Sequence, residues 1–423
     1  NPRIKGIKAG DKIISSDEFH KEIPKIISNL DNSYLYIQGP PGTGKTYQAA
    51  NAIIELLKQN KKIAITGLSH KVIHNLLQRI EDMASEKQFE FEGYKRGTLE
   101  DDDTVFNGEY IKTYEKDPVF MNALKERDKG QIFAGTKYHL ASTFYDEKID
   151  YLFIDETGQL SLADLISIGN IAKNIILIGD QNQLGQPIRG THPNESGQSI
   201  LDYLLEGKDT ISEDRGIFLN KTYRLNSKLN EFISSNFYEE RLICDKSTDK
   251  RIINFNKKSK IKDSGIHYIE MNHKNNVQTS IEEFEVIRDL MKEMIGLEFD
   301  DKGKKRKLSV DDFLIISPYN TQVNLLISKL EESKIKNPRV GTIDKFQGQE
   351  APVTIISMTS SDSDSLPRNK EFFFSRNRLN VAISRAQVAS IILFNPNLLD
   401  SSPKNLDQIK LMNNFFKLLN YKI

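Results

Sequence analysis

The sequence is poor in cysteine and in long apolar runs. Cys244 is the single cysteine among 423 residues, so this chain alone can form neither a disulfide framework nor a thiolate zinc site. A run of about 18 uncharged apolar residues, long enough to span a membrane, is absent, as is a signal-type start. We therefore expect a protein of the reducing cytoplasm. Because the first residue is Asn1 rather than Met, we also expect the chain to be part of a longer protein.

The chain also lacks net charge. Its 59 lysines and arginines equal its 59 aspartates and glutamates, so the basic excess that often marks a nucleic-acid-binding protein is not there. Any prediction of nucleic-acid binding must come from motifs instead. The length exceeds one ordinary hydrophobic core, and we therefore expect two domains.

One segment predicts nucleotide binding. "GPPGTGKT", residues 39–46, follows the apolar run 34–37 and precedes a helix-like apolar pattern. In such a loop the backbone N–H groups cradle phosphates, Lys45 reaches the β- and γ-phosphates, and Thr46 can ligate Mg²⁺. The alternative is a Gly/Pro turn between two core elements, but the strand–loop–helix context favours a phosphate loop.

A second segment predicts a metal site. "YLFIDETGQ" ends an apolar strand with Asp155 and Glu156. Two adjacent carboxylates at the end of a buried strand are costly to desolvate without a cation, and Mg²⁺ is the natural partner. In P-loop NTPases the Asp holds the metal, which leaves Glu156 to activate the attacking water. The alternative is a pair of solvated charges at a strand end.

Weaker signals follow along the chain. In "GDQNQL", Gln183 can accept and donate, which suits sensing of a γ-phosphate or its water. Tyr223 and Arg224 can stack on a base and contact phosphate, although such a pair is often ordinary packing. "RLNVAISRA" reads as a helix that presents Arg378 and Arg385 on one face, from which an arginine could complete a site on another domain.

Short apolar strands alternate with helical patterns throughout, which predicts an α/β fold with parallel sheets. Only the first half has a phosphate loop. We place a first domain at residues 1–230 and a second at 231–423. Three segments are predicted to be excursions, that is, insertions outside the alternating strands and helices. Their residues are 81–131 (charged), 244–264 and 359–370 (rich in Ser and Asp). The predicted strands are 34–37, 63–66, 151–154, 175–178, 266–269, 313–316, 340–343, 353–358 and 390–394.

The order of the motifs resembles that of a superfamily 1B helicase motor. The segments "GPPGTGKT", "TGLSHKVIHNLL", "FAGT", "DETGQ", "GDQNQL", "TYR", "SPYNTQ", "GTIDKFQGQE" and "NVAISRA" follow each other between residues 34 and 395. The chain is similar to the group of the nonsense-mediated-decay helicase and the nuclease–helicase fusions, and "FFFSRNRLNVAISRA" leans towards bacterial RecB-like nuclease–helicase proteins. The resemblance implies two tandem RecA-like domains.

The resemblance also implies a set of site residues. Catalytic roles would fall to Lys45, Glu156, Gln183, Arg224 and Arg385, with Arg385 as an arginine finger. ATP would contact Gly39, Pro40, Pro41, Gly42, Thr43, Gly44, Lys45, Thr46, Tyr223 (on adenine) and Glu350 (on ribose), and Mg²⁺ would contact Thr46 and Asp155. Single-stranded nucleic acid would touch Thr66, Ser69, His70, Asn75, Pro318, Asn320, Thr342 and Lys345. For His70, an ordinary hydrogen bond at a helix start is an equal alternative.

These expectations describe an ATP-dependent helicase or translocase that moves on single-stranded nucleic acid, with DNA favoured over RNA and travel 5′ to 3′. A nucleic-acid-gated ATPase switch that clamps without unwinding uses the same motifs and stays open. A P-loop kinase is disfavoured, since the second domain has no evident acceptor site. We find no nuclease acid cluster, so any nuclease domain would lie outside these residues.

Overall fold

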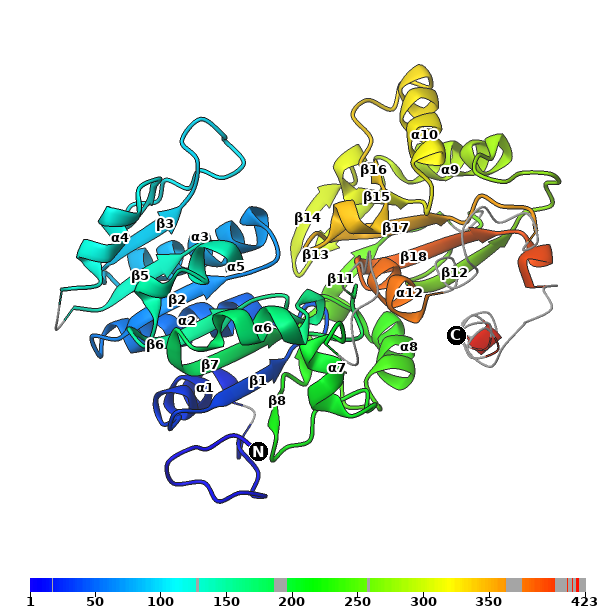
Figure 1. Cartoon of the computed structure of the whole chain (residues 1–423). Coiled ribbons are helices and arrows are strands. Elements are labelled where there is room, and N and C mark those ends of the chain that lie inside the picture. The colour runs from blue at the N-terminus through cyan, green and yellow to red at the C-terminus, as the bar shows by residue number, and fades with distance from the viewer. Residues whose placement is uncertain are drawn as a thin grey trace. The chain divides into compact units, whose positions relative to one another are not determined.

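The structure is a computed structural model that divides into two units. It describes residues 1–16, 18–126, 129–185, 196–256, 259–362, 375–399, 409, 413, 416 and 417. Unit 1 comprises residues 1–181 and 185–220, and unit 2 comprises residues 182–184 and 221–423. Each unit has its own main sheet (Figure 1). The boundary between the two units by contacts lies after residue 220. The division into functional domains at residues 1–230 and 231–423 stays a prediction.

The sheet of unit 1 has eight strands, and all of its pairings are parallel. From one edge to the other they are β4 (Ile111–Tyr114), β3 (Glu92–Arg96), β5 (Gln131–Ala134), β2 (Lys62–Thr66), β6 (Ile149–Ile154), β7 (Ala172–Gly179), β1 (Tyr34–Gln38) and β8 (Gly216–Phe218). The four strands predicted for the first half are therefore present as β1, β2, β6 and β7.

The strands form because short apolar runs are buried on both faces of the sheet. Along β1, Leu35, Tyr36 and Ile37 are all at most 1% exposed, although they alternate between the two faces. Leu35 and Ile37 belong to one core cluster that includes the apolar sides of α1, α2 and α3. The helices of unit 1 are α1 (Phe19–Ser28), α2 (Lys45–Leu57), α3 (His70–Glu86), α4 (Asp117–Ala123), α5 (Lys137–Leu140), α6 (Leu162–Gly169) and α7 (Ile200–Leu205), with 3₁₀ turns η1 (Thr143–Tyr145) and η2 (Thr157–Gln159).

The segment 81–131, expected to be a charged excursion, is part of the sheet. It begins within α3 and supplies β3 and β4, which pair in parallel with each other and extend the sheet beyond β5. The charged residues that marked this segment lie mostly in the loops, so composition alone concealed its two strands.

Glu81 holds this segment against α3. Its side chain is buried, at 5% exposure, and its carboxylate accepts backbone N–H bonds from Glu109 at 2.9 Å, Tyr110 at 3.0 Å and Ile111 at 2.8 Å. A Cβ atom on Gly108 would lie 2.0 Å from Glu81 Oε1, so the chain can approach the carboxylate only through glycine. One side chain therefore satisfies three donors at the start of β4.

We predict that Glu81→Ala destabilises unit 1 by about 2–4 kcal/mol, because it leaves buried N–H donors without an acceptor. Glu86→Ala on the same helix is the control, since Glu86 has an exposed side chain and such changes usually stay within about 0.5 kcal/mol. Thermal unfolding and amide exchange at residues 109–111 measure both variants. Equal stability of the two variants would contradict the assigned role.

Unit 2 has a five-stranded main sheet, again with only parallel pairings. Its order is β12 (Gly265–Glu270), β18 (Ala386–Phe394), β17 (Ala351–Ser357), β15 (Phe313–Ile316) and β16 (Val340–Gly341). All five strands predicted for the second half are present, but β16 is shorter than expected because Thr342 begins the 3₁₀ turn η5 (Ile343–Phe346). The predicted α/β class with parallel sheets is confirmed.

Helices cover this sheet as well. The apolar sides of α9 (Ile281–Met294) and α10 (Asn320–Glu332) join β15, β17 and β18 in one core cluster, and α8 (Ser227–Phe237) and α12 (Arg376–Ile383) contact β18. In Figure 1, α9 and α10 lie above the sheet and α8 and α12 below it. The remaining elements are β9 (Lys221–Thr222), β10 (Ile243–Cys244), β11 (Arg251–Ile253), β13 (Glu298–Asp301), β14 (Lys304–Lys307), η3 (Thr248–Lys250), η4 (Val310–Asp312) and η6 (Pro396–Leu399).

The other two predicted excursions are only partly described. Of 244–264, the described part holds β11, which pairs with β13 in a small antiparallel sheet. Of 359–370, residues 363–370 lie outside the described residues, as do residue 371 and residues 372–374, the first three of the "FFFSRNRLN" segment. Within the described part of the chain, each helix is too short or too polar to cross a lipid bilayer.

Candidate nucleotide and nucleic-acid sites

The phosphate loop lies between β1 and α2, as the sequence predicts. Gly42 and Gly44 have φ values of +74° and +79°, which side chains other than glycine rarely adopt. Gly44 is the residue before the first turn of α2, so the free N–H groups of that turn face the loop. Thr43 is buried, and its hydroxyl donates to the Pro40 carbonyl at 2.8 Å.

Lys45 bends back over the loop. Its Nζ donates to the Gly39 carbonyl at 2.5 Å, and a Cβ atom on Gly39 would lie 2.0 Å from Lys45 Cγ. The lysine can take this position only because Gly39 has no side chain. Gly39 N–H in turn donates to the Gly179 carbonyl at the end of β7, at 3.0 Å. The remaining loop residues Pro41 and Thr46 lie in the same segment, with Thr46 in the first turn of α2.

Asp155 and Glu156 follow β6 at the same edge of the sheet. Asp155 is 7% exposed, and its Oδ1 accepts the Glu156 N–H at 2.9 Å. Glu156 has φ +55° and ψ +44°, a left-handed conformation that costs a residue with a side chain of the order of 1 kcal/mol. The turn that follows is fixed by the Thr157 hydroxyl, which donates to the carbonyl of Ile178 on β7 at 2.5 Å.

The electrostatics of this carboxylate pair favour a cation. Burial, and then the neighbouring Glu156 carboxylate, raise the pKa of Asp155 above its usual range, and Lys45 opposes that shift. A bound divalent cation would offset the cost of the buried charge. The Asp155 carboxylate and the Thr46 hydroxyl are hard oxygen ligands of the kind that Mg²⁺ prefers, so these two residues fit the predicted metal.

The predicted strand-binding residues of unit 1 lie beside this pair. Thr66 ends β2, and its carbonyl accepts the Asp155 N–H at 3.0 Å. Ser69 caps α3 by accepting the Val72 N–H at 3.3 Å. His70 begins that helix and Asn75 is exposed on its second turn.

Sequence reasoning assigned no role to Gln159, although the residue belongs to "DETGQ". It lines a hollow with Thr66, Asp155, Glu156 and the exposed Tyr138. Within the described structure, Gln159 Nε2 and Thr66 Oγ1 are buried without a hydrogen-bond partner. One signal could have identified Gln159. It is a polar side chain in a motif segment whose other residues, Thr157 and Gly158, are buried.

The other predicted nucleotide-binding residues belong to unit 2 by their contacts. Gln183 is buried within the segment 182–184. Tyr223 follows β9 and is 51% exposed. Arg224 forms an ion pair with Glu350 through Nε, and its Nη1 donates to the Ser384 carbonyl at 3.2 Å. The predicted phosphate and ribose ligands thus contact each other here.

Arg385 differs from the prediction in its local structure. The helix α12 ends at Ile383, so Arg385 lies in the turn before β18 rather than on one helical face with Arg378. Its side chain is 3% exposed and its Nη1 donates to the Gln349 carbonyl at 3.1 Å. Arg378 instead pairs with Asp344 at 3.2 Å. The seven-residue spacing suggested one helix, but the chain leaves the helix to enter the sheet.

The strand-binding residues predicted for unit 2 lie at one sheet edge. Ile316 of β15 pairs with Gly341 of β16, so Pro318 and Asn320 follow one strand while Thr342 and Lys345 follow its neighbour. Asn320 and Lys345 are exposed, and Lys345 Nζ donates to the Val340 carbonyl at 3.1 Å.

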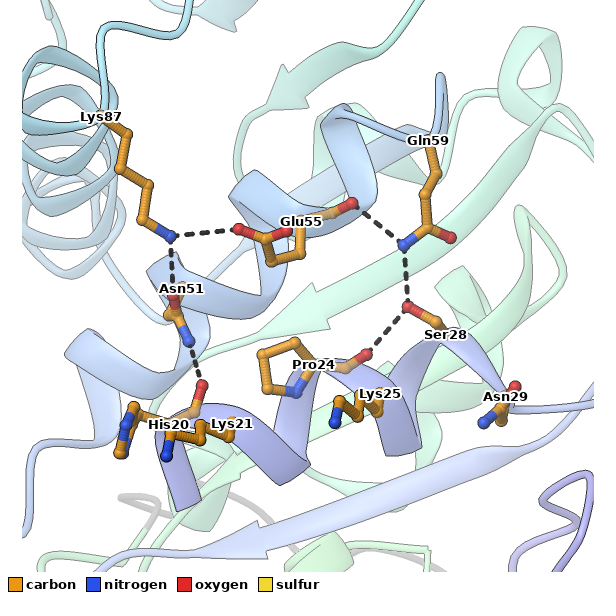
Figure 2. Close-up of a pocket in the computed structure, with 10 residues that line it drawn as sticks. All are labelled: His20, Lys21, Pro24, Lys25, Ser28, Asn29, Asn51, Glu55, Gln59 and Lys87. Atoms are coloured by element: carbon orange, nitrogen blue, oxygen red, sulfur yellow. Dashed lines mark hydrogen bonds and ion pairs between the residues drawn. The ribbon is translucent and has the colours of Figure 1, made fainter. Parts of the chain in front are cut away.

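A hollow between α1 and α2 contains none of these residues. As Figure 2 shows, its polar groups bond to one another. Lys87 Nζ donates to Asn51 at 2.9 Å and to Glu55 at 3.1 Å, and Asn51 donates to the His20 carbonyl at 2.7 Å. Gln59 Nε2 donates to the Ser28 hydroxyl at 3.1 Å. These hydrogen bonds hold α1 against α2. We therefore assign the hollow a structural role rather than a binding role.

The fold and the site define a P-loop nucleotide-binding protein. Two family models match the chain, and each is described as an AAA domain. One matches residues 24–188 and the other residues 197–397.

Relatives with curated functions cover most of the chain. The DNA replication ATP-dependent helicase/nuclease dna2 of Schizosaccharomyces pombe is 28% identical over 406 residues, which are 87% of this chain and 27% of the relative. The DNA polymerase alpha-associated DNA helicase A of the same organism is 25% identical over 411 residues, or 82% of this chain and 59% of the relative. The chain thus spans about a quarter to three fifths of the length of these relatives.

Among solved structures, a complex of the Arterivirus nonstructural protein 10 (helicase) with DNA matches 90% of this chain and 63% of that chain, at 14% identity and a TM-score of 0.46. The two AAA-domain models together match most of the chain, and the chain is homologous to the helicase and the helicase/nuclease named above. The resemblance in the motifs is confirmed.

We predict that Gly39→Ala weakens ATP binding about 10-fold or more, because the added methyl group displaces Lys45 and a hydrogen bond from a charged group contributes about 1.5–3 kcal/mol. Titration with a fluorescent ATP analogue measures the effect. The control is Gly169→Ala at the end of α6, where a Cβ atom meets only Ile175 Cδ1 at 3.6 Å. Unchanged affinity in the Gly39 variant would contradict the close packing of Lys45 on this glycine.

Proposed function

We propose that this chain is an ATP-driven motor that moves along single-stranded nucleic acid and unwinds a duplex ahead of it. One observation carries the proposal. The backbone of Asp155, at the nucleotide site, is hydrogen bonded at 3.0 Å to Thr66, a residue expected to touch the strand. Because β2 and β6 are neighbours in a parallel sheet, a change at the metal carboxylate shifts the strand site directly.

In unit 1 we assign the hydrolytic roles as follows. Lys45 binds the β- and γ-phosphates, and Thr46 and Asp155 hold Mg²⁺, which neutralises charge on the phosphates when bound. Glu156 accepts a proton from the attacking water. The loop residues 39–44 contact the phosphates through backbone N–H groups.

Further roles fall to residues of unit 2. We assign Gln183 to sensing of the γ-phosphate, Tyr223 to adenine, Glu350 to ribose, and Arg224 and Arg385 to phosphate oxygens. Bound nucleotide competes with Glu350 for Arg224, and Arg385 exchanges its bond to the Gln349 carbonyl for one to phosphate. The functional domains are then residues 1–230 and 231–423.

The strand would be DNA, since the curated relatives are named as DNA helicases. We propose contacts through Thr66, Ser69, His70 and Asn75, and a second set of residues after β15 and β16. Travel 5′ to 3′, a nuclease domain in the same protein and a cytoplasmic location complete the proposal.

The function is tested by ATPase activity titrated with single-stranded DNA and, separately, with RNA, followed by a strand-displacement assay. A motor hydrolyses ATP faster with DNA and releases the displaced strand. ATP hydrolysis that DNA stimulates without strand release would identify a clamping switch instead. Hydrolysis that neither polymer stimulates would refute both.

We predict that substitutions of Arg385 and Lys45 affect different steps, namely ATP hydrolysis and ATP binding. Arg385→Ala lowers the stimulated ATPase rate by about 10³-fold or more, as removal of arginine fingers does, and leaves ATP affinity within about threefold of wild type. Lys45→Ala weakens ATP binding as well, because Lys45 contacts the phosphates before hydrolysis.

Arg385→Lys should not restore the rate, since an ammonium group lacks the planar fork that spans two phosphate oxygens. Arg288→Ala is the matched control, because Arg288 lies on α9 and pairs only with its exposed neighbour Asp289 in the described structure. A near wild-type ATPase rate in Arg385→Ala would contradict a catalytic role for Arg385, and with it the part that unit 2 plays in the proposed mechanism.

A further inference from the structure

Lys95 on β3 is a cationic side chain with 0% exposure. Its Nζ lies 3.0 Å from His70 Nδ1 and donates to the Thr104 carbonyl. An ammonium group has three N–H donors and no acceptor. In this contact His70 Nδ1 must therefore be the acceptor, so the ring is neutral and its proton is on Nε2.

The groups around His70 keep the ring neutral. His74 faces it from the next turn of α3 with a ring centroid 6.1 Å away, and Asp101 faces it from the loop after β3. Burial, and then Lys95, lower the pKa of His70, while Asp101 acts in the opposite direction. Burial lowers the pKa of Lys95 to about 8, so this lysine stays protonated at neutral pH. Burial likewise lowers the pKa of His74 to about 4.

The loop between β3 and β4 fixes the lysine. The Thr104 hydroxyl donates to the Thr98 carbonyl at 2.9 Å and accepts the Thr98 N–H at 2.8 Å. Phe106 packs on His74 with ring centroids 5.5 Å apart. A Cβ atom on Gly97 would lie 2.5 Å from the Thr104 oxygen and 3.1 Å from Lys95 Nζ. The loop therefore closes tightly around the ammonium group.

The second nitrogen of His70 is available. Among the described residues, no group accepts a hydrogen bond from His70 Nε2, and the side chain is only partly buried. His70 follows Ser69 at the start of α3, on the same sheet edge as Thr66.

We propose that Lys95 is a positioning residue that holds His70 as a neutral imidazole, whose Nε2–H donates to a phosphodiester oxygen of the bound strand. The proposal rests on the proposed function, because it concerns the same strand site. A neutral donor adds a hydrogen bond but releases no counterion. The contact therefore leaves the salt dependence of binding unchanged.

Binding of a fluorescent oligothymidylate at pH 6 and pH 8, over a range of salt concentrations, tests the proposal. We expect His70→Ala to weaken binding about 3- to 10-fold with the same salt slope. His70→Gln should stay within about twofold of wild type, since its amide is a neutral donor. A cationic His70 would instead contribute about 0.7 to the slope on a single strand, and a loss of that size in His70→Ala would overturn the proposal, as would unchanged affinity.

Lys95→Met removes the cation that opposes protonation of His70, so the pKa of His70 rises although burial still lowers it. We expect this variant to gain affinity as the pH falls from 8 to 6, and Lys95→Met/His70→Ala to lack that gain. Lys95→Gln provides a second variant if Lys95→Met does not fold. Lys112→Met is the control, because Lys112 lies exposed on β4 of the same segment.

Nitrogen-detected NMR of the full chain without strand gives the independent measurement. Wild-type His70 should carry its proton on Nε2 at pH 6.5, and its pKa should rise in Lys95→Met. A doubly protonated His70 in the wild type overturns the Lys95 contact. If the wild type shows this tautomer but binds no single strand, the proposed function fails while the Lys95 contact stands.

Discussion

The parallel pairing of β2, β6, β7 and β1 is the constraint on which the site depends. In a parallel sheet every strand ends at the same edge, so the phosphate loop after β1, the carboxylates after β6 and Thr66 at the end of β2 lie at one edge although they are far apart in sequence. Backbone hydrogen bonds join the residues that follow neighbouring strands, for example Gly39 to Gly179 and Asp155 to Thr66. These bonds connect the segments along this edge of the sheet.

Buried charge is the second theme of the structure. Glu283 in unit 2 has a fully buried side chain, and its carboxylate accepts bonds from the Thr359 N–H, the Ser357 hydroxyl and His273 Nε2. Glu81 and Lys95 in unit 1 are satisfied in the same way. Asp155 receives only the Glu156 N–H among the described contacts to its side chain. The contrast is physical, because Glu81, Glu283 and Lys95 are neutralised by partners within the fold, whereas most lone pairs of the Asp155 carboxylate stay open to a ligand such as the proposed cation.

Much of the fold could be predicted from the sequence because its strands are short apolar runs between polar ends. All nine predicted strands are present, and the phosphate loop lies where its spacing indicates. Four strands of the unit 1 sheet escaped prediction, β3, β4, β5 and β8, as did the short strands outside the two main sheets. β3 carries Glu92, Lys95 and Arg96, and the edge strand β4 carries Lys112. Neither is an apolar run, and their charged loops made the segment 81–131 look like a solvated insertion. The helix expected to carry Arg385 ends at Ile383, two residues before it. It ends there because the chain turns to enter β18, and the local sequence pattern does not indicate that turn.

The sequence by itself determined the local chemistry of this protein, namely a phosphate loop, a carboxylate pair and the order of the motifs along the chain. Such features depend on neighbouring residues, so spacing and residue type are enough to indicate them. The tertiary structure alone decided that Lys95 meets His70, that Glu81 bonds the start of β4, and that Arg224 pairs with Glu350. These contacts join residues 25 to 126 positions apart, and no local periodicity encodes them. They arise only when the packing of helices on the sheet brings buried charges to the partners that make their burial possible.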